Sequence, residues 1–355
     1  MKHYFSTDTA RRLASQLGVD PDDYAAAIGP LVEDLEISDR VTVFADALHE
    51  RLPGEFPVAV GGIVEKLGPE LEEGEGYFNN AFHLWPVSRY IERYGLEHPE
   101  VSLDAIEALT RRFTGEWAVR PFLREYREMT MERVLEWAES PSHNVRRLAS
   151  EGIRPRLPWA PVHTPFTVDP SPILPILERL YRDPSKYVRT SVANNLNDIS
   201  RTHPALALET SQRWHADSPW VAERALRTLV KRGDPDALRI LGMEPGGIDI
   251  LAVDFPTAAR IGEAAELTVT LANTTDRPQQ VLADYRVHFR KANGQLRPSV
   301  FRLGKTELAP GERRTIVKRH VFRVTGTRTY YPGAQAVSVV VNGAGSALLP
   351  FELTA

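Results

Sequence analysis

The sequence of 355 residues contains no cysteine. Without thiols the chain can form neither disulfide bonds nor thiolate zinc sites, and this composition suits a reducing compartment. Long apolar runs are also absent, since no stretch approaches the roughly 20 residues needed to cross a bilayer. Residues 1–9, MKHYFSTDT, lack the apolar core of a signal peptide. We therefore expect a cytoplasmic protein with no membrane partner.

Several motifs of common enzyme classes are missing as well. No GxGxxG, P-loop or GxSxG sequence occurs, so dinucleotide binding, phosphate-loop chemistry and serine hydrolysis have no support. The histidines of the middle region do not fall at metal-ligand spacings and are better read as surface or capping residues: His143, His163, His203 and His215. We expect neither a metal nor a cofactor.

Acidic and basic residues are unevenly distributed along the chain. Residues 1–110 hold 8 basic and 21 acidic side chains, whereas residues 111–240 hold 21 basic and 16 acidic ones. Arginine supplies 19 of those 21 basic residues, and its planar guanidinium suits bidentate contacts with phosphate or carboxylate. A GC-rich genome that favours arginine codons would explain the same bias. A polyanionic partner for the middle and C-terminal regions is the other explanation.

The first 240 residues have the apolar periodicity and punctuation of helices. In the first third we predict helices over these ranges: 7–17, 21–36, 39–52, 56–68, 78–94 and 101–113. Further on, residues 140–153 align with 183–196 and more loosely with 217–229. A helical unit repeated every 33 to 45 residues or so is typical of an alpha-solenoid with HEAT-like repeats. We therefore predict such a solenoid for residues 1–242.

The helix expected after Ser185 carries two different faces. Its apolar stripe comprises Val188, Val192, Leu196 and Ile199, the spacing of a helix with one buried side. Tyr187, Asn194 and Asp198 share another ridge, which simple solvent exposure would explain.

The repeat alignment gives this ridge a second interpretation. Glu151 takes the position of Asn194, one helical turn before the position of Asp198. Two carboxylates on neighbouring repeats would then point into one groove.

A proline-rich connection, residues 154–172, joins these two helices. It is long for a turn between helical repeats, and long structured loops are often functional. Arg154, Arg156 and Trp159 stand at its start, directly after the helix that carries Glu151. Trp159 could cover a helix end, or it could present an aromatic plane at the groove.

Beyond Gly246 and Gly247 the sequence changes to short alternating segments. Strands are predicted at 248–255, 265–272, 285–290, 314–321 and 337–341. Without cysteine, about a hundred residues of this kind indicate an immunoglobulin-like beta-sandwich. The fold class predicted for the whole chain is thus mainly α, with a solenoid domain at 1–242 and a beta-sandwich domain at 248–355.

Two carboxylates, a tryptophan and several arginines on one surface suit a cation beside a polyanion. Carboxylates stabilise oxocarbenium-like transition states, and tryptophan attracts cations over its face. A DNA base alkylated on a ring nitrogen is such a cation. To act on such a base, the groove would need to bind the DNA backbone, recognise the charge and hydrate C1′.

Two segments resemble a known family. VRRLASEGIRPRLPWA (145–160) and DPSKYVRTSVANNLNDISRTHP (183–204) are similar to the most distinctive stretches of bacterial AlkC-type DNA alkylation repair proteins, relatives of AlkD with HEAT-like repeats. The resemblance runs from the N-terminus to about residue 242, and the remainder is similar to the immunoglobulin-like extension of one AlkC subgroup.

This resemblance implies a monofunctional DNA glycosylase that excises 3-methyladenine and 3-methylcytosine from duplex DNA by hydrolysis, without full base flipping. It assigns the active-site acids to Glu151 and Asp198, a further carboxylate near the pocket to Glu116 in TGEWAVRPF, and the lesion-facing aromatic to Trp159. The basic positions that it places near the DNA are Arg147, Arg154 and Arg189. A monomer is expected, associated with the nucleoid when bound to DNA.

Composition and repeats alone permit a different class of function. A noncatalytic scaffold that binds protein or nucleic-acid partners would have the same solenoid and sandwich, but it would bind without releasing a base. Sugar or cell-surface binding by the sandwich is a third alternative, which the missing signal peptide disfavours.

Overall fold

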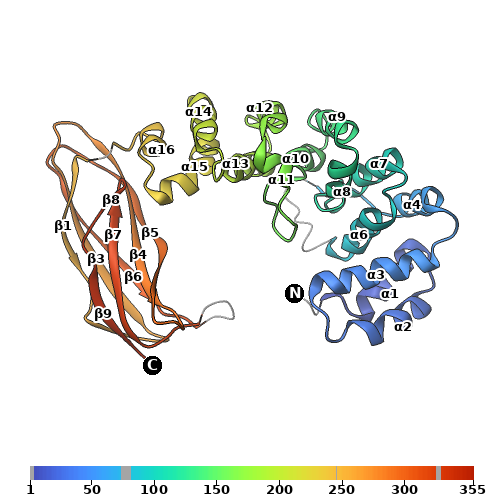
Figure 1. Cartoon of the computed structure of the whole chain (residues 1–355), viewed down its shortest axis with the longest axis horizontal. Coiled ribbons are helices and arrows are strands. Elements are labelled where there is room, and N and C mark those ends of the chain that lie inside the picture. The colour runs from blue at the N-terminus through green and yellow to red at the C-terminus, as the bar shows by residue number, and fades with distance from the viewer. Residues whose placement is uncertain (1–3, 73–80, 245, 325–328) are drawn as a thin grey trace. The chain divides into compact units, whose positions relative to one another are not determined.

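A computed structural model describes residues 4–72, 81–244, 246–324 and 329–355 (Figure 1). Contacts divide the chain into two compact units, Met1–Thr202 and His203–Ala355. None of the helices in the described ranges combines the length and the apolar character that crossing a bilayer requires.

The first unit is helical (Figure 1). Its described helices are α1 (Thr7–Leu17), α2 (Pro21–Val32), α3 (Ile37–Arg51), α4 (Phe56–Val64), η2 (Phe82–Leu84), α6 (Trp85–Tyr94), α7 (Pro99–Thr110), α8 (Val119–Glu125), α9 (Arg127–Trp137), α10 (His143–Glu151), α11 (Thr164–Val168), η3 (Ser171–Ile173), α12 (Leu174–Leu180) and α13 (Lys186–Ile199).

The predicted helices of the first third are confirmed, with ends shifted by a few residues. The segment predicted at 78–94 begins outside the described residues, and its described part is the short η2 followed by α6. Helix α6 has Pro86 in its first turn, where the missing amide proton removes no intrahelical hydrogen bond.

Helix α13 has the predicted buried stripe, because Val188, Val192, Leu196 and Ile199 are all inaccessible to solvent or nearly so. The side chains of Asp183 and Ser185, which precede the helix, do not cap its N-terminus with a hydrogen bond. The Asp183 carboxylate instead accepts a hydrogen bond from the backbone amide of Ser185. It also forms an ion pair with Arg146 of α10 at 2.6 Å. The carboxylate thus ties α13 to the preceding repeat.

The second unit combines three helices with two β-sheets. Its elements are α14 (Pro204–His215), α15 (Pro219–Arg232), α16 (Pro235–Ile240), β1 (Ile248–Asp254), β2 (Ala258–Arg260), β3 (Ala264–Asn273), β4 (Gln279–Arg290), β5 (Leu296–Leu308), β6 (Arg313–Val321), β7 (Gly333–Val341), β8 (Ala344–Gly345) and β9 (Leu349–Thr354). One sheet has the order β1-β3-β6, and the other has the order β2-β9-β7-β4-β5 with β8 beside β7.

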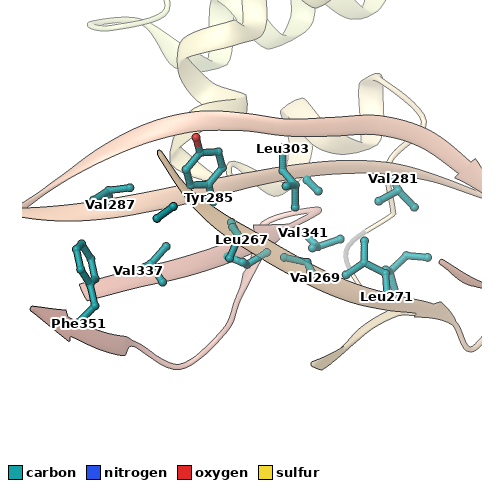
Figure 2. Packing of buried hydrophobic residues seen from close by; sticks show 14 of the residues in the cluster. Leu267, Val269, Leu271, Val281, Tyr285, Val287, Leu303, Val337, Val341 and Phe351 are labelled. Carbon is teal, nitrogen blue, oxygen red and sulfur yellow. The ribbon is translucent and has the colours of Figure 1, made fainter. Parts of the chain in front are cut away.

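The core of the β domain lies between these two sheets (Figure 2). Alternate residues of β3, among them Leu267, Val269 and Leu271, are buried against residues of β4 and β7 such as Val287 and Val337. This alternation is what a strand with one buried face requires. All five predicted strands are confirmed, as β1, β3, β4, β6 and β7.

The helices of the second unit share a small core with the sandwich. Leu282 of β4 packs with Leu226, Leu229 and Val230 of α15 and with Met243. The predicted domain boundary between 242 and 248 falls between α16 and β1, whereas contacts group α14 to α16 with the strands. The division into domains at 1–242 and 248–355 stays a prediction.

Candidate active site

Helices α10 and α13 pack against each other through small polar side chains. The Ser191 hydroxyl lies 3.1 Å from Ser150 Oγ, and Asn195 Nδ2 donates to the carbonyl oxygen of Ser150 at 2.8 Å. Serine side chains allow the two backbones to approach closely. As a result, Glu151 at the end of α10 and Asp198 at the end of α13 come within reach of one arginine.

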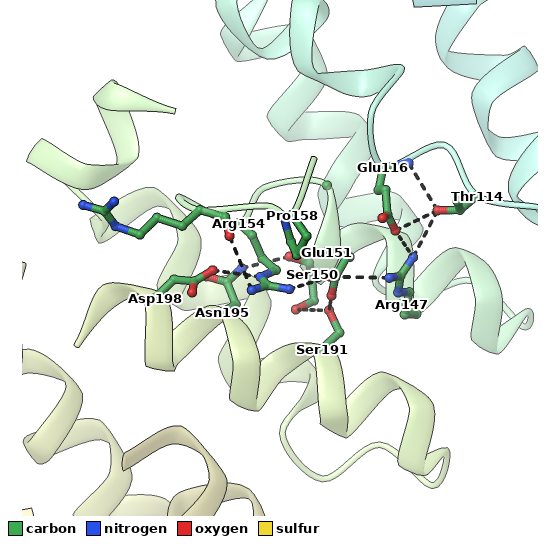
Figure 3. A network of polar contacts seen from close by, with 12 residues as sticks. Thr114, Glu116, Arg147, Ser150, Glu151, Arg154, Pro158, Ser191, Asn195 and Asp198 are labelled. Carbon is green, nitrogen blue, oxygen red and sulfur yellow. Dashed lines mark hydrogen bonds and ion pairs between the residues drawn. The ribbon is translucent and has the colours of Figure 1, made fainter. Parts of the chain in front are cut away.

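That arginine is Arg154, the first residue of the proline-rich connection (Figure 3). Its Nη1 donates to Glu151 Oε1 at 2.6 Å, and its Nε donates to Asp198 Oδ2 at 2.8 Å. Ser191 Oγ donates to the other oxygen of Glu151 at 2.5 Å. Within the described part of the chain, Asp198 Oδ1 accepts no hydrogen bond. The predicted pair of acids is therefore brought together, with an arginine between them.

Glu116 joins the same network through Arg147 (Figure 3). The Arg147 guanidinium forms a short ion pair with Glu116 Oε2, and its Nη2 lies 3.4 Å from Glu151 Oε1. Thr114 donates to the same Glu116 oxygen at 2.9 Å. The guanidinium carbon of Arg147 lies 5.1 Å from the centroid of the Tyr187 ring. Three carboxylates and two arginines thus form one continuous chain of contacts, and each is at most 7% exposed.

The three carboxyl groups differ in how easily they ionise. Burial raises the pKa of Asp198 and of Glu116, and the attraction of Arg154 and Arg147, respectively, offsets only part of that rise. Burial also acts on Glu151, but Arg147, Arg154 and the Ser191 hydrogen bond outweigh it and lower its pKa. Glu151 is consequently held as the anion, while Asp198 and Glu116 are the more basic members of the cluster.

Trp159 lies at the outer end of a stack of indole rings. It stacks on Trp85 with ring centroids 5.6 Å apart and on Trp117 at 6.2 Å, while 54% of its surface stays exposed. Its φ of 59° is left-handed, a conformation that costs a bulky residue of order 1–3 kcal/mol and is frequent at functional sites. The stacking contacts with Trp85 and Trp117 therefore fix the orientation of the exposed indole ring.

Arg120 of α8 holds the connection on both sides of Trp159. Its guanidinium donates to the carbonyl oxygen of Arg154 at 2.9 Å and to that of Pro161 at 2.8 Å. Trp117 Nε1 donates to the carbonyl oxygen of Pro158 at 3.2 Å. Burial, together with repulsion from Arg124 and Arg154, lowers the pKa of Arg120 to about 10. Among the described residues this arginine binds backbone oxygens and forms no ion pair, so it serves as an anchor for the loop.

We expect Arg120→Met to destabilise the helical unit by about 2 kcal/mol, because buried carbonyl oxygens would lose their donors. Urea unfolding, monitored by circular dichroism, measures the change in the free energy of unfolding. Arg124→Met is the matched control, since Arg124 is on the same helix but exposed, and it should be close to neutral. Equal stabilities of the two variants would contradict the anchoring role.

The remaining predicted residues lie outside this network. Arg189 donates to the carbonyl oxygens of Asp183 and Pro184 at the start of its own helix. Asn194 is partly buried on α13, and its Oδ1 has no hydrogen-bond partner among the residues that the structure describes. Tyr187 is the exception: it is 37% exposed, as expected for a solvated residue, but its ring also contacts the Arg147 guanidinium.

Some residues of the site were not predicted from the sequence. Ser191 donates to Glu151, Thr114 supports Glu116, and Arg120 and Trp85 position the loop with Trp159. A weak signal existed for Thr114, which lies two residues before Glu116 in a non-helical turn. For the others, identification requires knowing which helices are neighbours.

Comparison with known proteins places this geometry in a family. Residues 251–355 match the family described as "Uncharacterised protein YhaZ, C-terminal Ig-like domain", and residues 173–203 match the HEAT repeat. The chain is 38% identical over 326 residues to the uncharacterized protein YhaZ of Bacillus subtilis (strain 168), covering 90% of this chain and 88% of YhaZ.

Among solved structures, the chain is similar to the Pseudomonas fluorescens alkylpurine DNA glycosylase AlkC bound to DNA containing an abasic site analog. The two have a TM-score of 0.92 and 30% sequence identity, over 100% of this chain and 99% of that one. A match over both full lengths includes the helical part and the immunoglobulin-like part together. The chain therefore belongs to the AlkC family and carries a C-terminal immunoglobulin-like domain of the kind described for YhaZ.

Proposed function

We propose that this protein is a DNA glycosylase that removes cationic alkylated bases, such as 3-methyladenine and 3-methylcytosine, from double-stranded DNA. The observation that supports it most is the joining of Glu151 and Asp198 through Arg154 in a chain whose whole length matches a DNA-bound alkylpurine glycosylase. The reaction is hydrolysis of the N-glycosidic bond, which leaves an abasic site and an intact strand.

The two acids take different roles because their environments differ. Glu151 remains an anion and stabilises the positive charge that develops on the sugar as the bond breaks. Asp198, the stronger base, accepts a proton from the attacking water at Oδ1, the oxygen that Arg154 does not contact. Glu116 holds Arg147 beside Glu151 and adds negative potential to the site.

Trp159 supplies the surface against which the alkylated base rests. A cation above an indole face gains about 0.5 to 2 kcal/mol. The rigid stack beneath Trp159 fixes this face, so the base is recognised by its charge at the duplex surface without full rotation into a pocket.

Arg147 and Arg154 act in this proposal as internal partners of the acids. Since both guanidiniums are buried and paired, they keep the acids ionised and oriented instead of contacting phosphates. Arg189 remains a candidate for the DNA backbone.

The test is to incubate the purified protein with methylated duplex DNA and to identify the released bases by chromatography and mass spectrometry. Release of 3-methyladenine in excess of the spontaneous release without protein supports the proposal. Binding of DNA without base release would instead favour the scaffold function.

The rate of base release should fall at acidic pH. Protonation of Asp198 abolishes its action as the general base. Because burial raises the pKa of Asp198, this loss occurs at a higher pH than for an ordinary aspartate of pKa about 3.9. Glu151 stays ionised in that window because its pKa is lowered. Single-turnover rates measured from pH 8 downwards, corrected for release without protein, should decline about tenfold per pH unit below the raised pKa. A rate that is constant down to the ordinary aspartate range would contradict this role.

A further inference from the structure

Within the second unit, a cavity of about 270 Å³ lies between α15, the segment after α16, and strands β4 and β5. Its walls combine apolar residues with several arginines. Those that matter here are Trp220, Glu223, Arg224 and Arg227 of α15, and Arg302 of β5.

One carboxylate, Glu223, is among the residues that line this cavity, and Asp284 pairs with the lining residue Arg302. Glu223 pairs with Lys305 at 2.8 Å, and Asp284 pairs with Arg302 at 2.7 Å. Among the described residues, Arg224 forms no ion pair with a carboxylate, so its positive charge is left over. The cavity therefore has a net attraction for an anion.

The Arg224 side chain is held in place by an aromatic ring, but one of its hydrogen-bond donors lacks an acceptor. Its guanidinium carbon lies 5.7 Å from the centroid of the Trp220 ring, which orients the plane of the group. Its Nε is buried and has no hydrogen-bond partner in the described residues. Buried donors are nearly always paired in native proteins, so this one indicates a missing acceptor.

We propose that Arg224, with Arg227 beside it, binds a backbone phosphate of the DNA. A guanidinium offers parallel donors whose spacing matches two phosphate oxygens, and Arg227 is adjacent on the same helix, with its Nη1 2.8 Å from the carbonyl oxygen of Arg224. In the repeat alignment Arg227 takes the position held by Glu151 and Asn194 in the two preceding segments, so this segment has a base where the first has an acid. This repeat binds the strand, whereas the preceding ones carry the acids.

This inference rests on the proposed function, since it takes DNA as the anion. Its test uses undamaged duplex DNA, full-length protein and fluorescence anisotropy over a range of salt concentrations. We expect Arg224→Met to bind about tenfold more weakly at low salt and to reduce the slope of log affinity against log salt by about one. Arg224→Lys keeps the positive charge but loses the parallel N–H donors of the guanidinium, so its affinity for DNA should be intermediate.

Arg239→Met is the matched control, because Arg239 lies on α16 in the same unit and pairs with Asp236 outside the cavity. It removes the same charge and should leave the slope unchanged. Thermal unfolding of each variant identifies a loss of fold, and Arg224→Lys keeps the test valid if Arg224→Met does not fold.

Wild-type affinity and slope in both Arg224 variants would overturn the inference. The inference would also be overturned if inorganic sulfate stabilised the wild-type protein but not Arg224→Met, while the two proteins bound DNA with equal affinity. Failure of the proposed function is a separate result, because wild-type protein would then release no base whatever the Arg224 variants do.

Discussion

Glu151→Gln and Asp198→Asn are each expected to reduce base release from methylated duplex DNA by a hundredfold or more. Both changes keep the size of the side chain and remove its negative charge. A preorganised charge beside a developing cation typically contributes about 10²- to 10³-fold or more to the rate. Single-turnover release with protein in excess measures the chemical step, so weaker DNA binding cannot be mistaken for slower chemistry.

The matched control for these variants is Glu139→Gln. Glu139 follows α9 in the same unit and forms an exposed ion pair with Arg179, so the same chemical change occurs away from the site. It should leave the rate unchanged. Wild-type release by Glu151→Gln or by Asp198→Asn would remove that residue from the mechanism.

The largest loss of stability is expected for Arg154→Met. Arg154 is the common partner of Glu151 and Asp198, so its removal leaves two buried carboxylates without their bridging cation. Breaking a buried ion pair in this way costs about 3–5 kcal/mol. Urea unfolding of the full chain, followed by circular dichroism, measures the decrease in the free energy of unfolding.

A combined variant separates lost charge pairing from lost packing. If the cost arises from uncompensated carboxylates, Arg154→Met should be much less destabilising in a protein that already carries Glu151→Gln and Asp198→Asn. An equal cost in both backgrounds would show that Arg154 acts through packing alone, and it would contradict the ion-pair account of the site.

The repeat pattern predicted that Glu151 and Asp198 lie close together, and Arg154 links the two in the structure. The alignment of 140–153 with 183–196 puts Glu151 at the position of Asn194, one helical turn before Asp198. The role of the arginines was harder to predict. Whether Arg147 or Arg154 binds a phosphate or a carboxylate depends on the partner helix it faces, and a single sequence does not contain that information.

A similar limit applies to the β domain. Strand β5, Leu296–Leu308, was not predicted, because it contains Pro298 and Gly304 and most of its residues are exposed or half-buried. It lies at the edge of its sheet, where proline and charged residues are tolerated since one side needs no partner strand. The buried strands β3, β4 and β7 have the strong apolar signal that the sequence does reveal.

The central claim is that this chain cleaves the bond between an alkylated base and its sugar. The most direct measurement counts free bases and abasic sites in the same sample of methylated duplex DNA after incubation with the wild-type protein. We expect equal numbers of the two, both above the level without protein, and no strand breaks. DNA that is bound but yields neither free base nor abasic sites would contradict it.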